Sequence, residues 1–426
     1  MSMLMMLALG LGMSFSLVLL TMGKTTSYNP MEHKIDRLYS VQTDNWSEEP
    51  GSVFFQSRNF MPTAVSFRDA KAILASGIPA HTTMLSASGA ILDNPEKPET
   101  PPQMHSGYLV TRDFFKMFDV PFKYGGSWEE QGVYTGIHKI VLNEWANKVF
   151  FDGENAVGKL LLVNGTPYTV VGILEASWYQ APRMYDPSNS PLGYTPGLFF
   201  PFEDVSLYDF PRWGGHYDWQ KSEVNTHDGF LNSEILWARP WVEFEGDQQK
   251  ESFKRWLQGY IELEQSNGRY RRSNKFELSN TREWMIVVSG FQGFGELALA
   301  GLILLICSTN SIALLMAKFL RTTNDSAVRR ALGASRLSIF AQHIFEALLI
   351  AVGGGLLALL IGFYWFEVIK RTMTGADYEY LSQFAHLNVF SLLIIFCLVL
   401  VSTLLSGAIP AWRISRSPPV RYLNAE

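Results

Sequence analysis

Residues 324–362 read NDSAVRRALGASRLSIFAQHIFEALLIAVGGGLLALLIG, a short basic segment followed by a long apolar one. Arg329, Arg330 and Arg336 precede residues 347–366, which contain no Asp, Glu, Lys or Arg. About 20 apolar residues in a helix cross the ~30 Å hydrocarbon core of a bilayer. This stretch therefore predicts a membrane helix whose basic end is held at one surface of the membrane.

Three more stretches without Asp, Glu, Lys or Arg are long enough to cross a membrane, namely 1–23, 297–317 and 387–412. The alternative for each is a buried helix of a soluble core. However, three of the four stretches fall within the last 130 residues and are separated by short loops. A soluble domain could not cover so much apolar surface, so the sequence predicts four transmembrane helices. The net charge of −5 in 426 residues indicates no nucleic-acid partner.

The first stretch has a second interpretation, a cleaved signal peptide. It reads MSMLMMLALGLGMSFSLVLLTMG, with no basic residue before the apolar run and no A-x-A-like site after it. Its apolar part is longer than the roughly 7–15 residues of a signal-peptide core. We therefore favour an uncleaved anchor.

The basic residues predict the orientation. The loop 318–336 carries five Lys and Arg against Asp325 alone, and the tail 413–426 carries three Arg against Glu426 alone. Residues 24–290 hold more Asp and Glu than Lys and Arg. Short cytoplasmic loops are enriched in Lys and Arg. We therefore expect a multi-pass membrane protein with both termini in the cytoplasm and residues 24–290 on the outer side.

Together these patterns predict an α-helical membrane protein with four transmembrane helices plus a large α+β extracytoplasmic (periplasmic) domain between helices 1 and 2. The expected order is helix 1 (1–23), periplasmic domain (24–290), helix 2 (291–317), cytoplasmic coupling segment (318–337), helix 3 (338–366), short periplasmic loop (367–386), helix 4 (387–412) and cytoplasmic tail (413–426).

The outer region mixes strand and helix patterns, which predicts an α+β domain of two lobes. The segments KLLLVNG and YTVVGILEAS adjoin Asn164-Gly165 and indicate a hairpin. SFRDAKAILASG predicts a helix that Ser66 caps and Gly77 ends. The apolar residues of 246–265 recur at helical spacing.

Residues 178–241 are crowded with aromatic side chains and prolines. One interpretation is an aromatic contact surface for a partner or an amphipathic ligand. The other, which we favour, is a long loop packed on itself by its aromatic side chains.

The sequence lacks the motifs of common catalytic sites. It contains no G-x-x-x-x-G-K-[ST] phosphate loop, no H-E-x-x-H and no G-x-S-x-G. The histidines of the outer region lack paired ligand spacing, and the two cysteines, Cys307 and Cys397, both fall in predicted membrane helices. We therefore expect no enzyme activity, no metal site and no cofactor in this chain.

The basic segment of the opening stretch predicts a short amphipathic helix before the third membrane helix, with Ala327, Val328, Ala331 and Leu332 on its single apolar side. Asn324, Asp325 and Ser326 are suited to cap it, Gly333 to break it, and Ser335 to cap the next helix. Such a helix can dock in a groove of a cytoplasmic protein or simply anchor the loop at the interface. The coupling candidates are Ala327, Val328, Arg329, Arg330, Ala331, Leu332, Gly333 and Ala334.

Three polar residues fall within or near the predicted membrane helices, Glu296, Asn310 and Glu346. The two glutamates suit a proton relay or, as we favour, interfacial anchoring or a helix-end hydrogen bond. Asn310 is suited to bond a neighbouring helix. The run Gly353-Gly354-Gly355 permits close helix packing or local bending, of which we favour packing.

Four segments resemble the MacB/FtsX-type ABC transporter permeases. Residues 155–174, NAVGKLLLVNGTPYTVVGIL, and 106–125, SGYLVTRDFFKMFDVPFKYG, resemble recurrent segments of that family's periplasmic core domain. The opening segment resembles the family signature at Arg330, Ala331, Leu332, Gly333, Ala334, Ile339 and Glu346. The closing segment AIPAWRISRSPPVRYL resembles the family's end at Pro410, Ala411, Arg413, Pro418 and Leu423.

The resemblance implies a permease that pairs with a second copy or a related subunit. A separate ABC ATPase, which binds ATP and Mg²⁺, would dock on the coupling segment and transmit its motion to the periplasmic domain. For an efflux system, the resemblance also implies a periplasmic adaptor and an outer-membrane channel. Two alternatives stay open within the same family, an FtsX-like signalling scaffold that controls a periplasmic partner and a lipoprotein-extraction permease.

Overall fold

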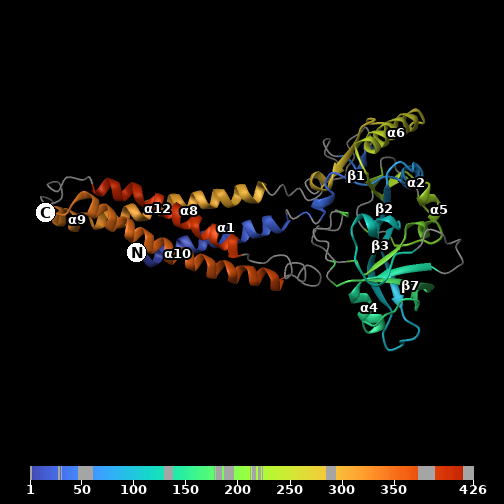
Figure 1. The fold of residues 1–426 in the computed structure, drawn as a ribbon, viewed down its shortest axis with the longest axis horizontal. Helices are drawn as coiled ribbons and strands as arrows, with labels where there is room; N and C mark the ends of the chain where they lie inside the picture. Colours follow the sequence, from blue (N-terminus) through green and yellow to red (C-terminus); the bar gives the residue numbers. More distant parts are fainter. Residues whose placement is uncertain are drawn as a thin grey trace. The chain divides into compact units, whose positions relative to one another are not determined.

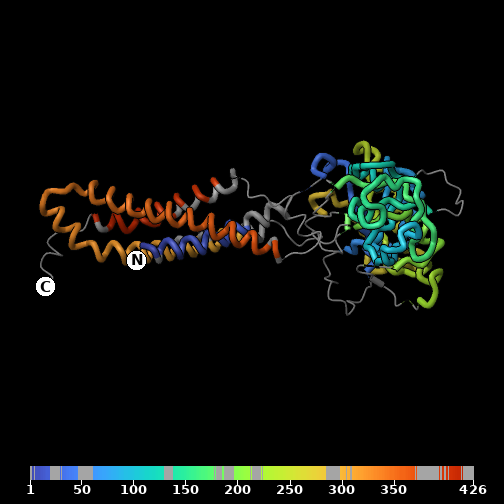
Figure 2. The backbone as a smooth tube through the Cα atoms, turned by 90° about the horizontal axis from the view of Figure 1, so that it is seen from below, coloured from blue at the N-terminus to red at the C-terminus, as the bar shows by residue number. Residues whose placement is uncertain are grey.

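The charge-free stretches of the sequence form four long helices that lie side by side (Figures 1 and 2). The computed structural model describes residues 2–26, 29, 31–46, 61–128, 138–176, 178, 185–186, 196–211, 213, 217–218, 222, 224–284, 294–372 and 389–415. The long helices are α1 (Ser2–Thr26), α8 (Phe294–Arg321), α10 (Arg336–Thr372) and α12 (Val389–Ser415), with the short α9 (Thr323–Ala331) between α8 and α10. They form one structural unit, 1–28 with 291–426, and residues 29–290 form a second.

Two helices in the described part of the chain are long and apolar enough to cross a membrane, Ala298–Arg321 with 24 residues and Arg336–Ile369 with 34. At about 1.5 Å per residue the second is ~50 Å long, more than the hydrocarbon core requires. The apolar part of α1, Met5–Leu19, is shorter. Crossing by α1 and α12, and the orientation of the termini, remain predictions.

Glycines allow the long helices to approach closely. A Cβ on Gly353 would lie 2.8 Å from Sδ of Met6, and one on Gly354 would lie 3.1 Å from Cβ of Leu9. Since Met6 and Leu9 belong to α1, the predicted packing role of this glycine run is confirmed at these two positions. Gly12 of α1 similarly faces Cys307 of α8.

The unit of residues 29–290, which we call the outer domain, is built on a large mixed sheet. Among the described residues the sheet has ten strands, ordered β12-β1-β11-β2-β3-β8-β5-β7-β4, with β6 paired to β2 and β7. The strands are β1 (Leu38–Thr43), β2 (His81–Asp93), β3 (Gln103–Val110), β4 (Phe122–Gly125), β5 (His138–Leu142), β6 (Leu160–Val163), β7 (Thr166–Leu174), β8 (Leu198–Pro201), β11 (Arg239–Glu243) and β12 (Phe276–Asn280). The β3–β8 and β5–β7 pairs are parallel, and the other pairs are antiparallel. The remaining strands, β9 (Tyr217–Asp218) and β10 (Ile235–Leu236), form a separate antiparallel pair.

Helices of the outer unit connect these strands. They are α2 (Phe67–Ala75), α3 (Asp113–Met117), α4 (Glu144–Phe151), α5 (His227–Leu231) and α6 (Asp247–Ser266), with short 3-10 helices at η1 (Glu32–Lys34) and η3 (Phe202–Ser206). The predicted α+β region is thus a β-rich domain with helices between its strands.

Three local predictions for this domain are confirmed. β6 and β7 form an antiparallel hairpin, and Asn164 and Gly165 turn it with positive φ angles of 49° and 82°. The side chain of Ser66 accepts a hydrogen bond from the backbone of Asp69 and caps α2. The helix predicted at 246–265 is present as α6, and its residues Phe253, Leu257 and Ile261 are buried on one face.

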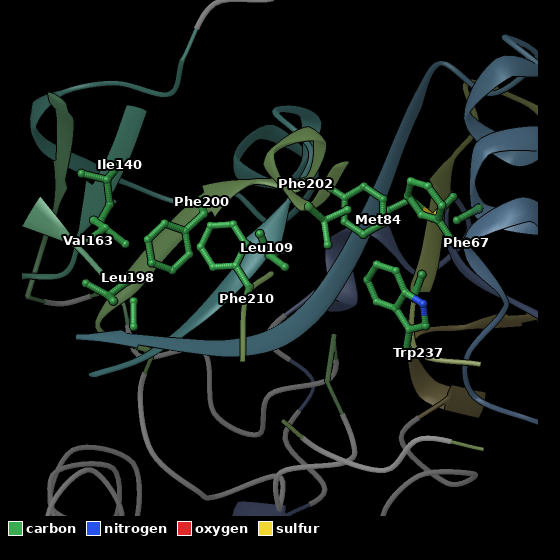
Figure 3. Close-up of a cluster of buried hydrophobic side chains, with 14 of the residues drawn as sticks. Phe67, Met84, Leu109, Ile140, Val163, Leu198, Phe200, Phe202, Phe210 and Trp237 are labelled. Carbon is green, nitrogen blue, oxygen red and sulfur yellow. The ribbon is translucent and has the colours of Figure 1, made fainter. Parts of the chain in front are cut away.

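The sheet has a hydrophobic core on each face. Met84 belongs to one cluster of buried side chains and its neighbour Leu85 to the other. Because consecutive strand residues point to opposite faces, the two clusters flank the sheet. In the first cluster Phe67 stacks on Trp237, with ring centroids 5.8 Å apart (Figure 3).

The aromatic-rich stretch 178–241 supplies much of both cores. Trp178, Tyr185, Phe210, Trp237 and Trp241 are all buried. Their burial in the cores disfavours an exposed contact surface at these residues, but the prediction of a long loop packed on itself was wrong, because the stretch includes β8, η3, α5 and β11. Other aromatic residues of the stretch, such as Tyr194 and Trp219, lie outside the described residues.

Candidate functional site

The short helix α9 lies at one end of the helical unit, where the chain turns from α8 into α10 (Figure 1). Its start differs from the sequence prediction. The N-cap is Thr322, which makes no side-chain capping bond, and the predicted capping residues lie inside the first two turns. Hydroxyl groups instead bond back to the preceding turn, Thr323 Oγ1 to Phe319 O at 3.1 Å and Ser326 Oγ to Thr322 O at 3.0 Å.

One side of α9 is fixed against the long helices. Thr323, Ser326 and Ala327 are buried. Ser326 Oγ lies 3.5 Å from Nε2 of His343, a buried α10 residue whose ring packs on Phe319 of α8 at a centroid distance of 4.4 Å. These contacts join α9 to both neighbouring helices.

The opposite side of α9 exposes large apolar side chains. Val328 is 47% exposed and Leu332, at the C-cap, is 83% exposed. Leu337, in the first turn of α10, is 74% exposed. We call Val328, Leu332 and Leu337 the docking surface. Exposed apolar groups of this size suit a contact with another protein or with a membrane surface.

The turn after α9 fixes the position of Leu332. Gly333 has a φ of +103°, which a residue with a Cβ rarely adopts. The amide of Ala334 donates to Arg329 O at 3.0 Å and that of Gly333 to Arg330 O at 3.1 Å, which ends the helix as in a Schellman motif. Ser335 Oγ then accepts from the amide of Ser338 at 3.1 Å and caps α10 as predicted.

The prediction of a single apolar side on α9 was wrong. Ala327 faces the long helices, while Val328, Ala331 and Leu332 are exposed. The buried side of the helix therefore consists of Thr323, Ser326 and Ala327, and the larger apolar residues lie on the exposed side. Arg329 is exposed and donates from Nη1 to Gln342 Oε1 at 2.9 Å, which ties α9 to α10.

The polar residues of the long helices occupy different environments. Glu346 lies on α10 and forms an ion pair with Lys318 of α8, Nζ–Oε2 3.0 Å. Asn310 is exposed on α8. Glu296 also falls on α8, but its side chain lies outside the described residues. The ion pair between Glu346 and Lys318 therefore joins α10 to α8, the two helices that flank α9.

Sequence reasoning missed three residues of this site. Leu337 is an isolated apolar residue between Arg336 and Ser338, and only this position next to the coupling segment pointed to a role in the site. Lys318 and His343 acquire their roles only because α8 and α10 lie side by side, which no local pattern reports.

The chain matches two protein-family profiles. The MacB-like periplasmic core domain matches residues 2–229, more than half of the chain, and the FtsX-like permease C-terminal domain matches residues 297–419. A β-rich outer domain and a unit of long apolar helices in this order define an ABC transporter permease. The chain belongs to the MacB/FtsX-type family of these permeases.

Several curated relatives resemble the chain at low identity. The macrolide export ATP-binding/permease protein MacB of Azoarcus sp. is 23% identical over 407 residues, 92% of this chain and 53% of the relative. MacB of Acinetobacter baylyi is 20% identical over 74% of this chain and 42% of the relative. The uncharacterized ABC transporter permease YvrN of Bacillus subtilis is 23% identical over 60% and 56%. The chain spans about half the length of these curated relatives.

Two solved structures resemble the outer part. The periplasmic region of MacB from Actinobacillus actinomycetemcomitans is 16% identical, with a TM-score of 0.35 over 60% of this chain and 94% of that one. The extracellular domain of the transporter YknZ from Gram-positive bacteria is 10% identical, with a TM-score of 0.35 over 57% and 100%.

Proposed function

We propose that this chain is the permease subunit of a MacB-type exporter driven by a separate ABC ATPase. In this proposal ATP and Mg²⁺ bind the ATPase, the permease sits in the bacterial inner membrane with both termini in the cytoplasm, and a second permease completes the complex. The ATPase binds to the docking surface, and closure of the ATPase moves α9. The observation that carries the proposal is the exposure of Leu332 and Leu337 beside a helix whose other side is fixed to α8 and α10.

The geometry of α9 supports transmission of motion rather than simple anchoring. An interfacial anchor needs only apolar exposure, which would rest in lipid. Here the inward side of α9 is also bonded to α8 and α10 through Thr323, Ser326 and Arg329. The ion pair of Lys318 with Glu346 joins α8 to α10 close by. A push on the docking surface therefore displaces both long helices together.

The outer domain supports export as the use of that motion. Its match to the MacB-like periplasmic core domain includes the hairpin and strands of the large sheet. Such a domain, moved from the cytoplasmic side, could drive a substrate onward through a periplasmic adaptor and an outer-membrane channel.

Co-purification tests the proposal. The full chain, tagged at its C-terminus, is expressed with its genomic neighbours and isolated in mild detergent. The proposal predicts a stoichiometric ATPase with a phosphate-binding loop, together with an adaptor or channel component. Recovery of a periplasmic hydrolase instead would favour the FtsX-like scaffold, and recovery of the intact chain without any ATPase would reject both.

A further inference from the structure

The two chain segments that connect the outer domain to the long helices are bonded to each other inside that domain. Asn29, which follows α1, donates from Nδ2 to Thr281 Oγ1 at 2.9 Å, and Thr281 lies on the segment that leads to α8. Asn29 Nδ2 also donates to Glu32 Oε2 at 2.9 Å, and Glu32 forms an ion pair with Arg282. We call Asn29, Glu32, Thr281 and Arg282 the tether clamp.

The clamp adjoins two paired strands. β1 follows the first tether and β12 precedes the second, and residues 39–43 of β1 pair antiparallel with residues 276–280 of β12. Neighbouring residues of both tethers are anchored in one hydrophobic cluster, with Met31 and Trp284 both buried. Trp284 also meets Trp241 of β11 edge-on at a centroid distance of 5.6 Å. A pull on either tether therefore reaches the same strands and the same core.

The helices at the other ends of these tethers are also joined. Gly12 of α1 faces the Cys307 side chain of α8 so closely that a Cβ on Gly12 would clash with Sγ. Ser16 Oγ of α1 donates to the carbonyl of Ala300 on α8 at 3.4 Å. α1 and α8 are thus paired within the helical unit, and their continuations are paired again within the outer domain.

From this double pairing we infer that the tether clamp makes α1 and α8 act on the outer domain as one element, so that its residues are positioning residues for force transmission. The inference rests on the proposed function, because a driven motion of the helices is what the clamp transmits. Separate tethers could slide past each other and dissipate that motion. The bond from Asn29 to the buried Thr281 and the ion pair of Glu32 with Arg282 oppose such sliding.

The direct test is a spin-label distance measurement on the full chain bound to its ATPase in lipid nanodiscs. Labels are placed at Met3→Cys on α1 and Leu263→Cys on α6, both exposed, in a background of Cys307→Ala and Cys397→Ala. The distance is compared without nucleotide and with ATP plus vanadate. The inference predicts a shift that Arg282→Glu reduces at least twofold and that the exchanged pair Glu32→Arg with Arg282→Glu restores in part, since the exchange remakes the ion pair but not the bond from Asn29 to Glu32.

A matched control separates coupling from general surface charge. Lys123 and Glu144 form an ion pair on the outer domain, Nζ–Oε1 2.9 Å, away from the tethers and less exposed than the pair of Arg282 with Glu32. Lys123→Glu should leave the shift unchanged. A full shift in Arg282→Glu, or a loss that the exchanged pair does not restore even in part, would overturn the clamp. Absence of any shift in the unsubstituted chain would reject the proposed function as well.

A disulfide provides the second arm. Asn29→Cys with Thr281→Cys, in the same cysteine-free background, links the tethers when oxidised. The clamp inference predicts that oxidation does not lower the ATP turnover of the complex below its value in the reduced state, because the tethers need not separate during the cycle. Turnover that falls at least tenfold on oxidation and returns with dithiothreitol would show that the tethers must separate and would overturn the inference.

Discussion

Arg269 and Asp69 form a bidentate ion pair inside the outer domain, with Nη1–Oδ1 at 2.8 Å and Nη2–Oδ2 at 2.9 Å. Asp69 lies in the first turn of α2, and Arg269 follows the end of α6. Both side chains are buried, and the same guanidinium also donates to Glu234 and Glu264. One arginine therefore neutralises carboxylates from three separate parts of the chain.

Replacement of this arginine should strongly destabilise the outer domain. Arg269→Met leaves buried carboxylates without their counter-charge, a change that typically costs about 3–5 kcal/mol. The free energy of unfolding is measured by denaturant titration of the full chain in detergent, followed by tryptophan fluorescence. The control is Lys254→Met, which removes only the exposed pair with Glu251 and should leave the transition in place. A loss below about 1 kcal/mol for Arg269→Met would contradict the role of this ion pair.

The same pair predicts a pH dependence. Burial raises the pKa of Asp69, but the charge of Arg269 and hydrogen bonds from Arg269, Ser66 and Tyr260 lower it further, so that the pKa lies below the ordinary value of 3.8. Because the folded-state pKa is depressed, the stabilisation is present above pH 3.8 and is lost as the pH falls through the folded-state value. The difference in unfolding free energy between the unsubstituted chain and Arg269→Met should therefore narrow below pH 3.8. A difference that stays constant from neutral pH into that range would contradict the assignment.

Gly89 of β2 makes room for the indole of Trp213, which would clash with a Cβ at that position. The contact is reinforced where Ser88 Oγ donates to Pro211 O at 2.7 Å and the amide of Trp213 donates to Ala87 O at 3.2 Å. Gly89→Ala should displace the indole and cost about 1–3 kcal/mol. The control Gly259→Ala, in the interior of α6 with open space around it, should stabilise by about 0.5–1 kcal/mol. Equal changes in the free energy of unfolding for Gly89→Ala and Gly259→Ala would show that Trp213 does not pack against Gly89.

The contact between α1 and α8 can be tested with two substitutions, of which the second should compensate for the first. Gly12→Ala places a Cβ against Sγ of Cys307 and should lower the thermal unfolding midpoint in detergent, by overpacking worth about 1–3 kcal/mol. Cys307→Ala removes the sulfur, and its Cβ lies 3.6 Å from the new methyl group, so the double variant should recover. Gly301→Ala, with no neighbour within 4 Å, serves as the control. Failure of Cys307→Ala to rescue Gly12→Ala would contradict this helix contact.

Features set by short stretches of sequence could be predicted. The β6–β7 hairpin follows from Asn164-Gly165, because these residues adopt the positive φ angles that the turn needs. The cap of α2 at Ser66 and the face of α6 that buries Phe253 follow from spacing alone. In each case the residues that determine the feature lie close together in the sequence.

Features set by tertiary packing could not be predicted. Asp69 and Arg269 are 200 residues apart, and neither has a local signal for the other. The short helix predicted between two long ones is present as α9, but Ala327 is buried while Val328 and Leu332 are exposed. That division depends on how α9 packs in the helical unit, which no local pattern reports.

The central claim is that the docking surface binds the ATPase. Leu332→Asp places a charge on its most exposed leucine, 83% exposed and in contact with no core, so the fold should be unaffected. Leu263→Asp, on the exposed side of α6 in the outer domain, is the matched control.

The most direct measurement is the affinity of the ATPase for the full chain in nanodiscs, compared among the unsubstituted chain, Leu332→Asp and Leu263→Asp. A charge buried in an apolar contact should weaken binding at least about tenfold, or ~1.4 kcal/mol, and abolish stimulated ATP hydrolysis, whereas Leu263→Asp should change neither. Unchanged affinity and unchanged stimulation in Leu332→Asp would contradict the assignment of α9 and its following turn as the site of coupling.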